Sequence, residues 1–348
     1  MRVQEAIHLA AQWVAEQAAG LAGFCGAYLS GSVVEKTPED DFDDASDVDL
    51  VLVLRDTAAF SHQKRRYRGM LLEVTPIALA EFEDTDHVLC THYLAWAMTH
   101  GCILADPDGL LEKRHREAAA LWQTPRYVRA RVEDFLEKLA EGGMCFKPDA
   151  PLQDKVTAWA FGAGIAVFPI LTAAGQNCTV RKRFSAVRAV LEMYGEVAFC
   201  GKLTGLLTGP SFDSSCLPAH MDALERLFDL TADSKGPSEG WRFRCEIAED
   251  TRHAAIDDTR RIVLSDHPED AVFWMLATFS RCLTVLWMDD RAFWARETAA
   301  LSEFAASLGV QTDADIRARR EELCALLPEI RAVSERILNQ RQQNAEDA

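Results

Sequence analysis

The stretch "GSVVEKTPEDDFDDASDVDLVLVL" (residues 31–54) joins an acidic loop to an apolar segment. Between Glu35 and Asp49 it carries eight carboxylates and one lysine, and the run "VLVL" follows at once. Apolar and β-branched residues on both faces are typical of a central strand, so residues 48–54 are predicted to be buried in a sheet. The acids allow two interpretations: they form a solvated loop, or the last two, Asp47 and Asp49, hold a cation.

Asp47 and Asp49 are expected to point to the same side of this strand, because side chains on a strand alternate between its two faces. Adjacent carboxylates repel each other, and Mg²⁺, which prefers carboxylate oxygens, removes that repulsion. Glu73 is the single charge in the apolar run "MLLEVT". If its strand lies beside residues 48–54, the three carboxylates can hold one or two metal ions, which lie about 3.5–4 Å apart in two-metal sites.

Gly31 and Ser32 directly follow the short apolar segment "FCGAYLS" (24–30), where a tight turn is predicted. Glycine lets the backbone approach a ligand, and backbone amides together with a serine hydroxyl bind phosphate oxygens. A phosphate-binding turn, a D-x-D pair and a third carboxylate together indicate metal-assisted phosphoryl transfer. The other acids, at residues 38–44, are assigned to a solvated insertion without a chemical role.

Strands are expected only near the start of the chain. Residues 24–30, 48–54 and 68–79 have strand patterns, and helical spacing of apolar residues dominates afterwards. Between about 209 and 265 the pattern weakens and Gly, Pro and Ser cluster, which predicts loops and short helices.

This organisation predicts the α+β fold class and two domains, for which 348 residues are sufficient. The first, residues 1–82, is a small sheet with flanking helices and carries the candidate chemistry. The second, residues 83–338, is mostly α-helical and is expected to close the cleft and select the acceptor. Residues 339–348 are predicted to be a polar, frayed tail.

Composition limits the partners and the compartment. The net charge of −17 argues against a nucleic-acid partner held by phosphate contacts and suits a small or cationic substrate. Ten cysteines without a C-x-x-C pair indicate reduced thiols in a cytoplasmic protein.

One uncharged stretch, "VTAWAFGAGIAVFPILTAAG" (156–175), has the length of a membrane span. It is rich in Ala, Gly and Thr and contains Pro169. A fully apolar helix is also what the centre of a large helical domain requires, so a core helix is predicted and no membrane is expected.

The segments "LSGSVV" and "SDVDLVLVL", followed by the carboxylate of "LLEVTPI", resemble the DNA polymerase β-type nucleotidyltransferase superfamily. Within it the chain is most similar to bacterial aminoglycoside adenylyltransferase-like proteins, which append an α-helical domain to a minimal nucleotidyltransferase core with a small mixed sheet. The resemblance covers residues 24–79. One departure is the fourteen residues between Ser32 and Asp47, a longer separation than compact members have.

The resemblance implies a role for each matching residue. Gly31 and Ser32 would bind the triphosphate of ATP or another nucleoside triphosphate, and Asp47 and Asp49 would ligate Mg²⁺. Glu73 would be either the third ligand or the base that activates the acceptor hydroxyl. The implied reaction transfers AMP from ATP to a hydroxyl of a small-molecule acceptor, such as an aminoglycoside-like cation, and releases pyrophosphate.

Three basic residues are further candidates for nucleotide phosphates: Lys155, Arg181 and Lys182, which flank the apolar stretch 156–175. Two competing functions stay open. One is a member of the same superfamily that modifies a protein hydroxyl or makes a nucleotide signal, and the other is a non-catalytic nucleotide-binding module. The acceptor, the nucleotide and the presence of a homodimer stay open as well.

Overall fold

The computed structural model describes residues 1–42 and 46–346. The chain divides into two compact units, Met1–Val128 and Arg129–Ala348. All strands of the described residues lie in the first unit, and the second is helical, so the expected α+β class is confirmed. The division falls inside helix α5 (Pro125–Gly142).

The first unit is built on one mixed five-stranded sheet with the order β3-β4-β2-β1-β5. β2 and β4 are parallel, and the other neighbouring pairs are antiparallel. Because β2 and β4 run the same way, residues near their starts meet at one end of the sheet. The strands are β1 (Phe24–Ser30), β2 (Val48–Leu54), β3 (Gln63–Tyr67), β4 (Met70–Ala78) and β5 (Cys102–Ala105).

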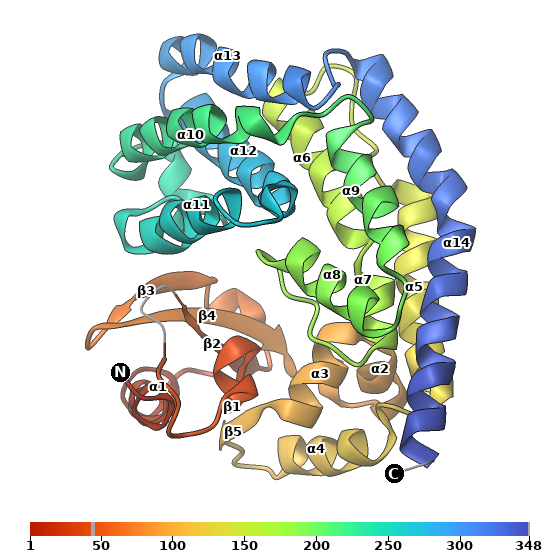
Figure 1. Cartoon of the computed structure of the whole chain (residues 1–348). Helices are drawn as coiled ribbons and strands as arrows, with labels where there is room; N and C mark the ends of the chain where they lie inside the picture. Colours follow the sequence, from red (N-terminus) through yellow and green to blue (C-terminus); the bar gives the residue numbers. More distant parts are fainter. Residues whose placement is uncertain (43–45, 347–348) are drawn as a thin grey trace. The chain divides into compact units, whose positions relative to one another are not determined.

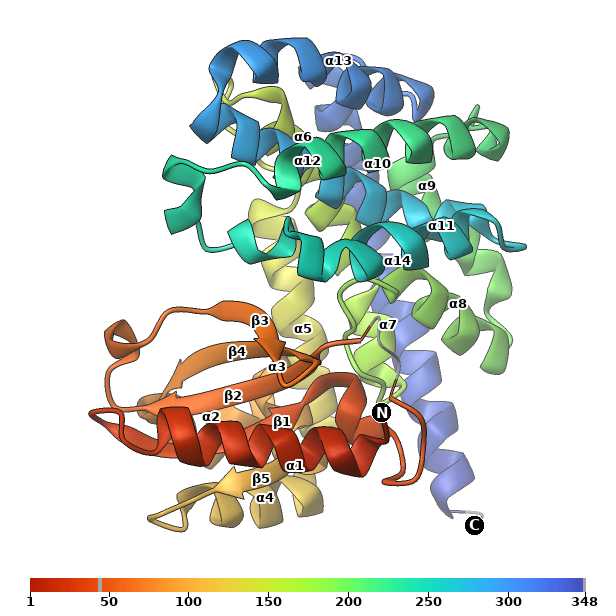
Figure 2. The same ribbon diagram turned by 90° about the vertical axis from the view of Figure 1, so that its left-hand side faces the viewer.

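Helices cover both faces of this sheet (Figures 1 and 2). On one face, Val48 and Leu50 pack into a core with apolar residues of α1 (Val3–Trp13). On the other, Val51 and Val53 pack against the segment that follows the sheet, α2 (Thr85–Cys90), α3 (His92–His100) and α4 (Leu110–Leu121). The alternation expected for residues 48–54 is therefore present, with both faces buried.

The strand β3 was not predicted from the sequence, because "QKRRY" is charged and lacks apolar alternation. It forms a hairpin with β4 through Arg68 and Gly69, both in the left-handed region at φ 48° and 88°. Two central residues with positive φ are what a tight two-residue hairpin turn requires. The hairpin places the polar strand β3 at the edge of the sheet.

The first unit is larger than the domain predicted at 1–82. β5, which the sequence pattern also missed, pairs with β1, and α2–α4 bury apolar side chains against the sheet. The unit therefore continues to Val128, because the sheet face that carries Val51 and Val53 needs these helices to cover it.

The second unit packs around helix α12, in which thirteen of eighteen residues are buried. The stretch 156–175 forms two consecutive helices, α6 and α7, rather than one, and α6 packs beside α12 (Figure 1). The helices of this unit are α6 (Leu152–Ile165), α7 (Phe168–Ala173), α8 (Arg183–Met193), α9 (Cys200–Thr208), α10 (Leu217–Ala232), α11 (Asp258–Val263), α12 (Val272–Asp289), α13 (Arg291–Ser307) and α14 (Asp313–Glu346).

Two segments, Leu152–Ala173 and Pro268–Asp289, are long and apolar enough to cross a membrane by length and composition. In each, 78% of the most apolar window is buried inside the structure. Core helices of soluble proteins have this property as well. The expected core position of residues 156–175 is confirmed.

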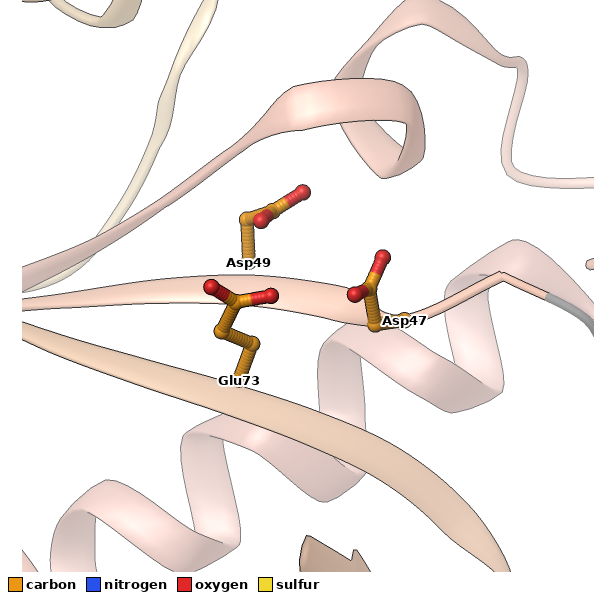
Figure 3. Close-up of side chains that lie close together, drawn as sticks. All are labelled: Asp47, Asp49 and Glu73. Carbon is orange, nitrogen blue, oxygen red and sulfur yellow. The ribbon is translucent and has the colours of Figure 1, made fainter. Parts of the chain in front are cut away.

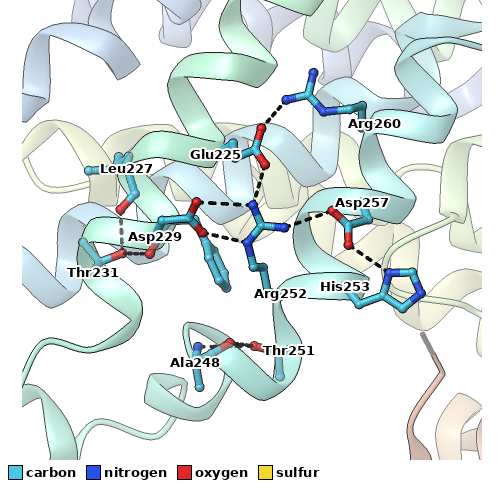
Figure 4. A network of polar contacts seen from close by, with 11 residues as sticks. Glu225, Leu227, Asp229, Thr231, Ala248, Thr251, Arg252, His253, Asp257 and Arg260 are labelled. Atoms are coloured by element: carbon cyan, nitrogen blue, oxygen red, sulfur yellow. Dashed lines mark hydrogen bonds and ion pairs between the residues drawn. The ribbon is translucent and has the colours of Figure 1, made fainter. Parts of the chain in front are cut away.

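The segment 209–265 is more regular than predicted, since it contains the sixteen-residue helix α10. An ion-pair network attaches the following segment to α10 (Figure 4). Arg252 contacts Glu225 and Asp229 of α10, the latter at 2.8 Å, and Asp257 at 3.1 Å. Charged side chains rather than apolar periodicity organise this part, which explains its weak sequence pattern.

The expected frayed tail at 339–348 is wrong for residues 339–346, which continue helix α14. Gln, Arg, Ala and Glu are all good helix formers, and they extend a helix that the packing of its earlier turns already stabilises. Apolar residues of α14 such as Ile330, Val333 and Ile337 are fully buried.

Candidate metal site at the start of two parallel strands

The three predicted carboxylates come together at one end of the sheet (Figure 3). Asp47 directly precedes β2, Asp49 is its second residue, and Glu73 is the fourth residue of β4. One oxygen of each lies within 4.8 Å of the others, and all three side chains are partly exposed. Among the described residues, this is the single group of three His, Cys, Asp or Glu side chains with such spacing.

The register of the sheet produces this convergence. Asp49 is paired with Glu73 across the parallel strands, and with Ser30 at the end of β1. Residues paired across neighbouring strands project to the same face. Asp49 lies on the same face of β2 as Val51 and Val53. From Val51 onward this face is apolar and covered by helices. The carboxylates thus occupy the open end of an otherwise buried sheet face.

Gly31 follows β1 and begins a short 3-10 helix, Gly31–Glu35. Its φ of 67° is in the left-handed region, and a Cβ at this position would lie 1.8 Å from Asp49 Oδ2. The backbone can therefore pass against the Asp49 carboxylate only because residue 31 is glycine. The expected tight turn is present, with Ser32 as the second residue of the 3-10 helix. Phosphate binding by Gly31 and Ser32 stays a prediction.

Two side chains of the site come from the polar segment at β3 and were missed in the sequence. Lys64 is paired in register with Glu73, and its Nζ lies 2.9 Å from Glu73 Oε2 and in contact with Asp47 Oδ2. His62 Nε2 lies 2.9 Å from Glu73 Oε1. The signal that could have revealed them is the Arg68–Gly69 turn, which predicts a hairpin and hence a strand before it.

Burial and the neighbouring charges shift the two carboxyl groups in opposite directions. Burial raises the pKa of Asp47 although Lys64 lowers it, and the charge of Glu73 adds to the increase. Burial alone would also raise the pKa of Glu73, but the hydrogen bond with His62 and the charge of Lys64 hold it well below its usual range. Glu73 therefore keeps its negative charge more firmly than Asp47 does, and a cation beside Asp47 would relieve the penalty there.

The donor set fits a hard divalent cation. All three donors are carboxylate oxygens, which Mg²⁺ and Mn²⁺ prefer, and their partial exposure leaves room for water or phosphate oxygens. Asp47, Asp49 and Glu73 are the residues that would hold such an ion. The geometric prediction of three converging carboxylates is confirmed, while their metal binding and catalysis stay predictions.

The acidic insertion is tied to the start of the chain. The Val3 N–H donates to the Asp40 carbonyl at 3.0 Å, and Phe42 is buried in the core beside α1. The side chains of Glu39, Asp40 and Asp41 are exposed, as a solvated loop requires. Asp43 and Asp44 lie outside the described residues.

The three basic candidates lie in the second unit, and each pairs with a carboxylate there. Lys155 Nζ lies 2.9 Å from both Asp313 oxygens. Asp258, only 8% exposed, is contacted by Arg181 at 2.9 Å and by Lys182 at 3.1 Å. The structure thus places these side chains in ion pairs of the helical unit, and nucleotide binding by them stays a prediction.

No protein-family model matches this chain, and a search of curated proteins finds no match. A functional assignment therefore depends on the residues of the site.

Proposed function

We propose that this chain is a Mg²⁺-dependent nucleotidyltransferase of the DNA polymerase β-type superfamily, with the sheet unit as its nucleotidyltransferase core. It transfers AMP from ATP to a hydroxyl of a small-molecule acceptor. The observation that carries the proposal is the convergence of Asp47, Asp49 and Glu73 within 4.8 Å at the start of two parallel strands. The G-S turn beside Asp49 gives it further support.

In this reaction the acceptor oxygen forms a bond to the α-phosphorus of ATP, and the bond from that phosphorus to the bridging oxygen breaks. Pyrophosphate leaves, and the hydroxyl proton passes to a base or to water. When bound, Mg²⁺ supplies positive charge for the phosphate oxygens. Asp47 and Asp49 would hold the cation, and the Gly31–Ser32 turn would offer backbone amides and a hydroxyl to the triphosphate.

Glu73 is better suited to organise the site than to act as the general base. Its two oxygens already contact His62 and Lys64, at 2.9 Å each. Those contacts hold its pKa well below the usual range, whereas an efficient general base has a pKa near the working pH. Of the two roles that the sequence left open for Glu73, third ligand or base, these contacts argue against the base.

The acceptor class rests on charge. With 54 acidic and 37 basic residues the chain attracts cations, which suits an aminoglycoside-like acceptor. The alternative within the same superfamily is an enzyme whose acceptor is a protein hydroxyl or a second nucleotide. Intact-mass analysis of each candidate acceptor after incubation with ATP and Mg²⁺ distinguishes these products.

The test is Mg²⁺-dependent release of pyrophosphate from the four nucleoside triphosphates with a panel of hydroxyl acceptors. We expect release by the wild type and a loss of at least about 100-fold in Asp49→Ala, because a site that stabilises charge in the transition state loses about that much when one key group is removed. The matched control is Glu39→Ala, an exposed carboxylate of the same unit, with unchanged release.

Equal rates in the wild type and Asp49→Ala would contradict the assignment of the metal site. Absence of release with every triphosphate and acceptor, together with retained ATP binding, would instead support the non-catalytic nucleotide-binding module.

A further inference from the structure

Lys64 is a buried cation inside the carboxylate group. Its side chain is 7% exposed, and its ammonium nitrogen contacts Asp47 Oδ2 and lies 2.9 Å from Glu73 Oε2. Lysine is rarely buried unless it is paired, and here two carboxylates from two strands pair with it. Lys64 therefore contacts two of the three residues that would hold a metal ion.

The backbone keeps Lys64 in this position. The residue faces Glu73 in the register of the β3–β4 hairpin, and the turn at Arg68 and Gly69 fixes that register. His62, two residues earlier and so on the same face, contacts the other oxygen of Glu73. With one oxygen contacted by Lys64 of β3 and the other by His62 just before that strand, Glu73 is directed toward Lys64 as well as toward the two aspartates.

The ammonium of Lys64 lies where a second divalent ion would be needed. It already supplies positive charge to Asp47 and Glu73, the contacts that such an ion would otherwise provide. A second divalent ion about 3.5–4 Å from the first would have to enter the position between Asp47 and Glu73, where the ammonium already lies.

We propose that Lys64 is a resident cation that takes the place of one of two metal ions, so that the three carboxylates accept a single divalent cation. This inference rests on the proposed metal site and specifies its stoichiometry, which the sequence left at one or two ions. Lys64 is thereby a positioning residue: it holds Asp47 and Glu73 in place without a second metal.

The test counts Mn²⁺ ions bound by the full-length chain in the absence of nucleotide, by electron paramagnetic resonance with calorimetry as a second measurement. The number of Mn²⁺ ions bound by Asp49→Ala is subtracted from each count, because weak binding elsewhere on the acidic surface is the same in both proteins. We expect one ion for the wild type and two for Lys64→Met, which keeps the length of the side chain and removes its charge. Lys113→Met, an exposed lysine of the same unit, is the matched control and should bind one.

Two ions in the wild type would overturn the inference, and this count requires no variant at the lysine. One ion in both the wild type and a folded Lys64→Met would overturn it as well; Lys64→Gln, checked by circular dichroism, serves as a second variant if the methionine does not fold. Failure of the proposed metal site gives a different result, namely equal Mn²⁺ binding by the wild type and Asp49→Ala.

Discussion

The candidate metal site and the cluster around Asp258 group their acids and cations in opposite ways. At the sheet, three carboxylates lie within 4.8 Å of one another, and Lys64 and His62 contact two of them. In the helical unit, one carboxylate, Asp258, is contacted by Arg181, Lys182 and Arg261. Several cations around one acid stabilise its charge. Adjacent carboxylates repel one another, and groups that oppose stability in this way are typical of functional sites, which is the physical argument for function at the sheet.

The largest effect is expected at Asp258. Asp258→Asn leaves the mostly buried Arg181 without its carboxylate, and breaking a buried ion pair in this way costs about 3–5 kcal/mol. We expect a decrease in the free energy of unfolding toward the lower end of that range, measured by urea denaturation, with Mn²⁺ binding by the folded protein unchanged. A decrease in the free energy of unfolding below about 1 kcal/mol would show that Asp258 contributes no more than an exposed ion pair. The Asp258 cluster would then not be a stabilising structural cluster.

Gly31→Ala tests how tightly the turn is fitted to Asp49. A Cβ at residue 31 would lie 1.8 Å from the Asp49 carboxylate oxygen, so Asp49 must move. Together with the positive φ, this should cost about 2–3 kcal/mol and weaken Mn²⁺ binding. Gly69→Ala is the matched control, because Gly69 has a φ of 88° but nothing within 4 Å of its Cβ position. Similar losses in the two variants would show that backbone conformation alone accounts for the effect.

Asp49→Asn should change stability in the opposite direction to Asp258→Asn. The amide keeps the shape of the side chain and removes one of three neighbouring negative charges. In the presence of a chelator we expect the free energy of unfolding to rise by about 1 kcal/mol, as is common when a functional residue that opposes stability is replaced. Destabilisation of the metal-free protein by this variant would show that repulsion among the three carboxylates does not oppose folding.

The smallest effect is expected at Lys182, whose side chain is 49% exposed at the edge of the Asp258 cluster. Exposed ion pairs contribute about 0–1 kcal/mol, so Lys182→Gln should change stability by less than about 0.5 kcal/mol. Titration with ATP in the same variant tests the predicted nucleotide contact separately. A tenfold loss of ATP affinity at unchanged stability would show that Lys182 contacts the nucleotide. Unchanged affinity would show that Lys182 serves only the ion pair with Asp258.

The three carboxylates of the site could be predicted because side chains alternate between the two faces of a strand. Asp47, Asp49 and Glu73 are charges in otherwise apolar runs, and alternation fixes their common face. Lys64 and His62 could not be found in this way, because β3 is polar on both faces and the direction of a side chain there depends on the hairpin register with β4. The contribution of an edge strand to a site is set by pairing, which a local pattern does not encode.

The boundaries were less predictable for a similar reason. β5 has four residues, too few for a pattern, and becomes a strand because β1 offers it an edge. The end of α14 is polar throughout, and its helix continues from a packed segment rather than from an apolar stripe of its own. In both places a neighbouring element decides the local structure.

The location of the three carboxylates within residues 47–73 has a consequence for heat denaturation. A bound ion stabilises only the folded form of the part that binds it, by about 2.7 kcal/mol when its free concentration is 100 times the dissociation constant. All three carboxylates of the proposed site belong to Met1–Val128. Addition of Mn²⁺ during calorimetry should therefore shift the melting of that unit to higher temperature. Where the two units melt independently, one broad transition would separate into two, and the ion would determine which half of the chain melts last.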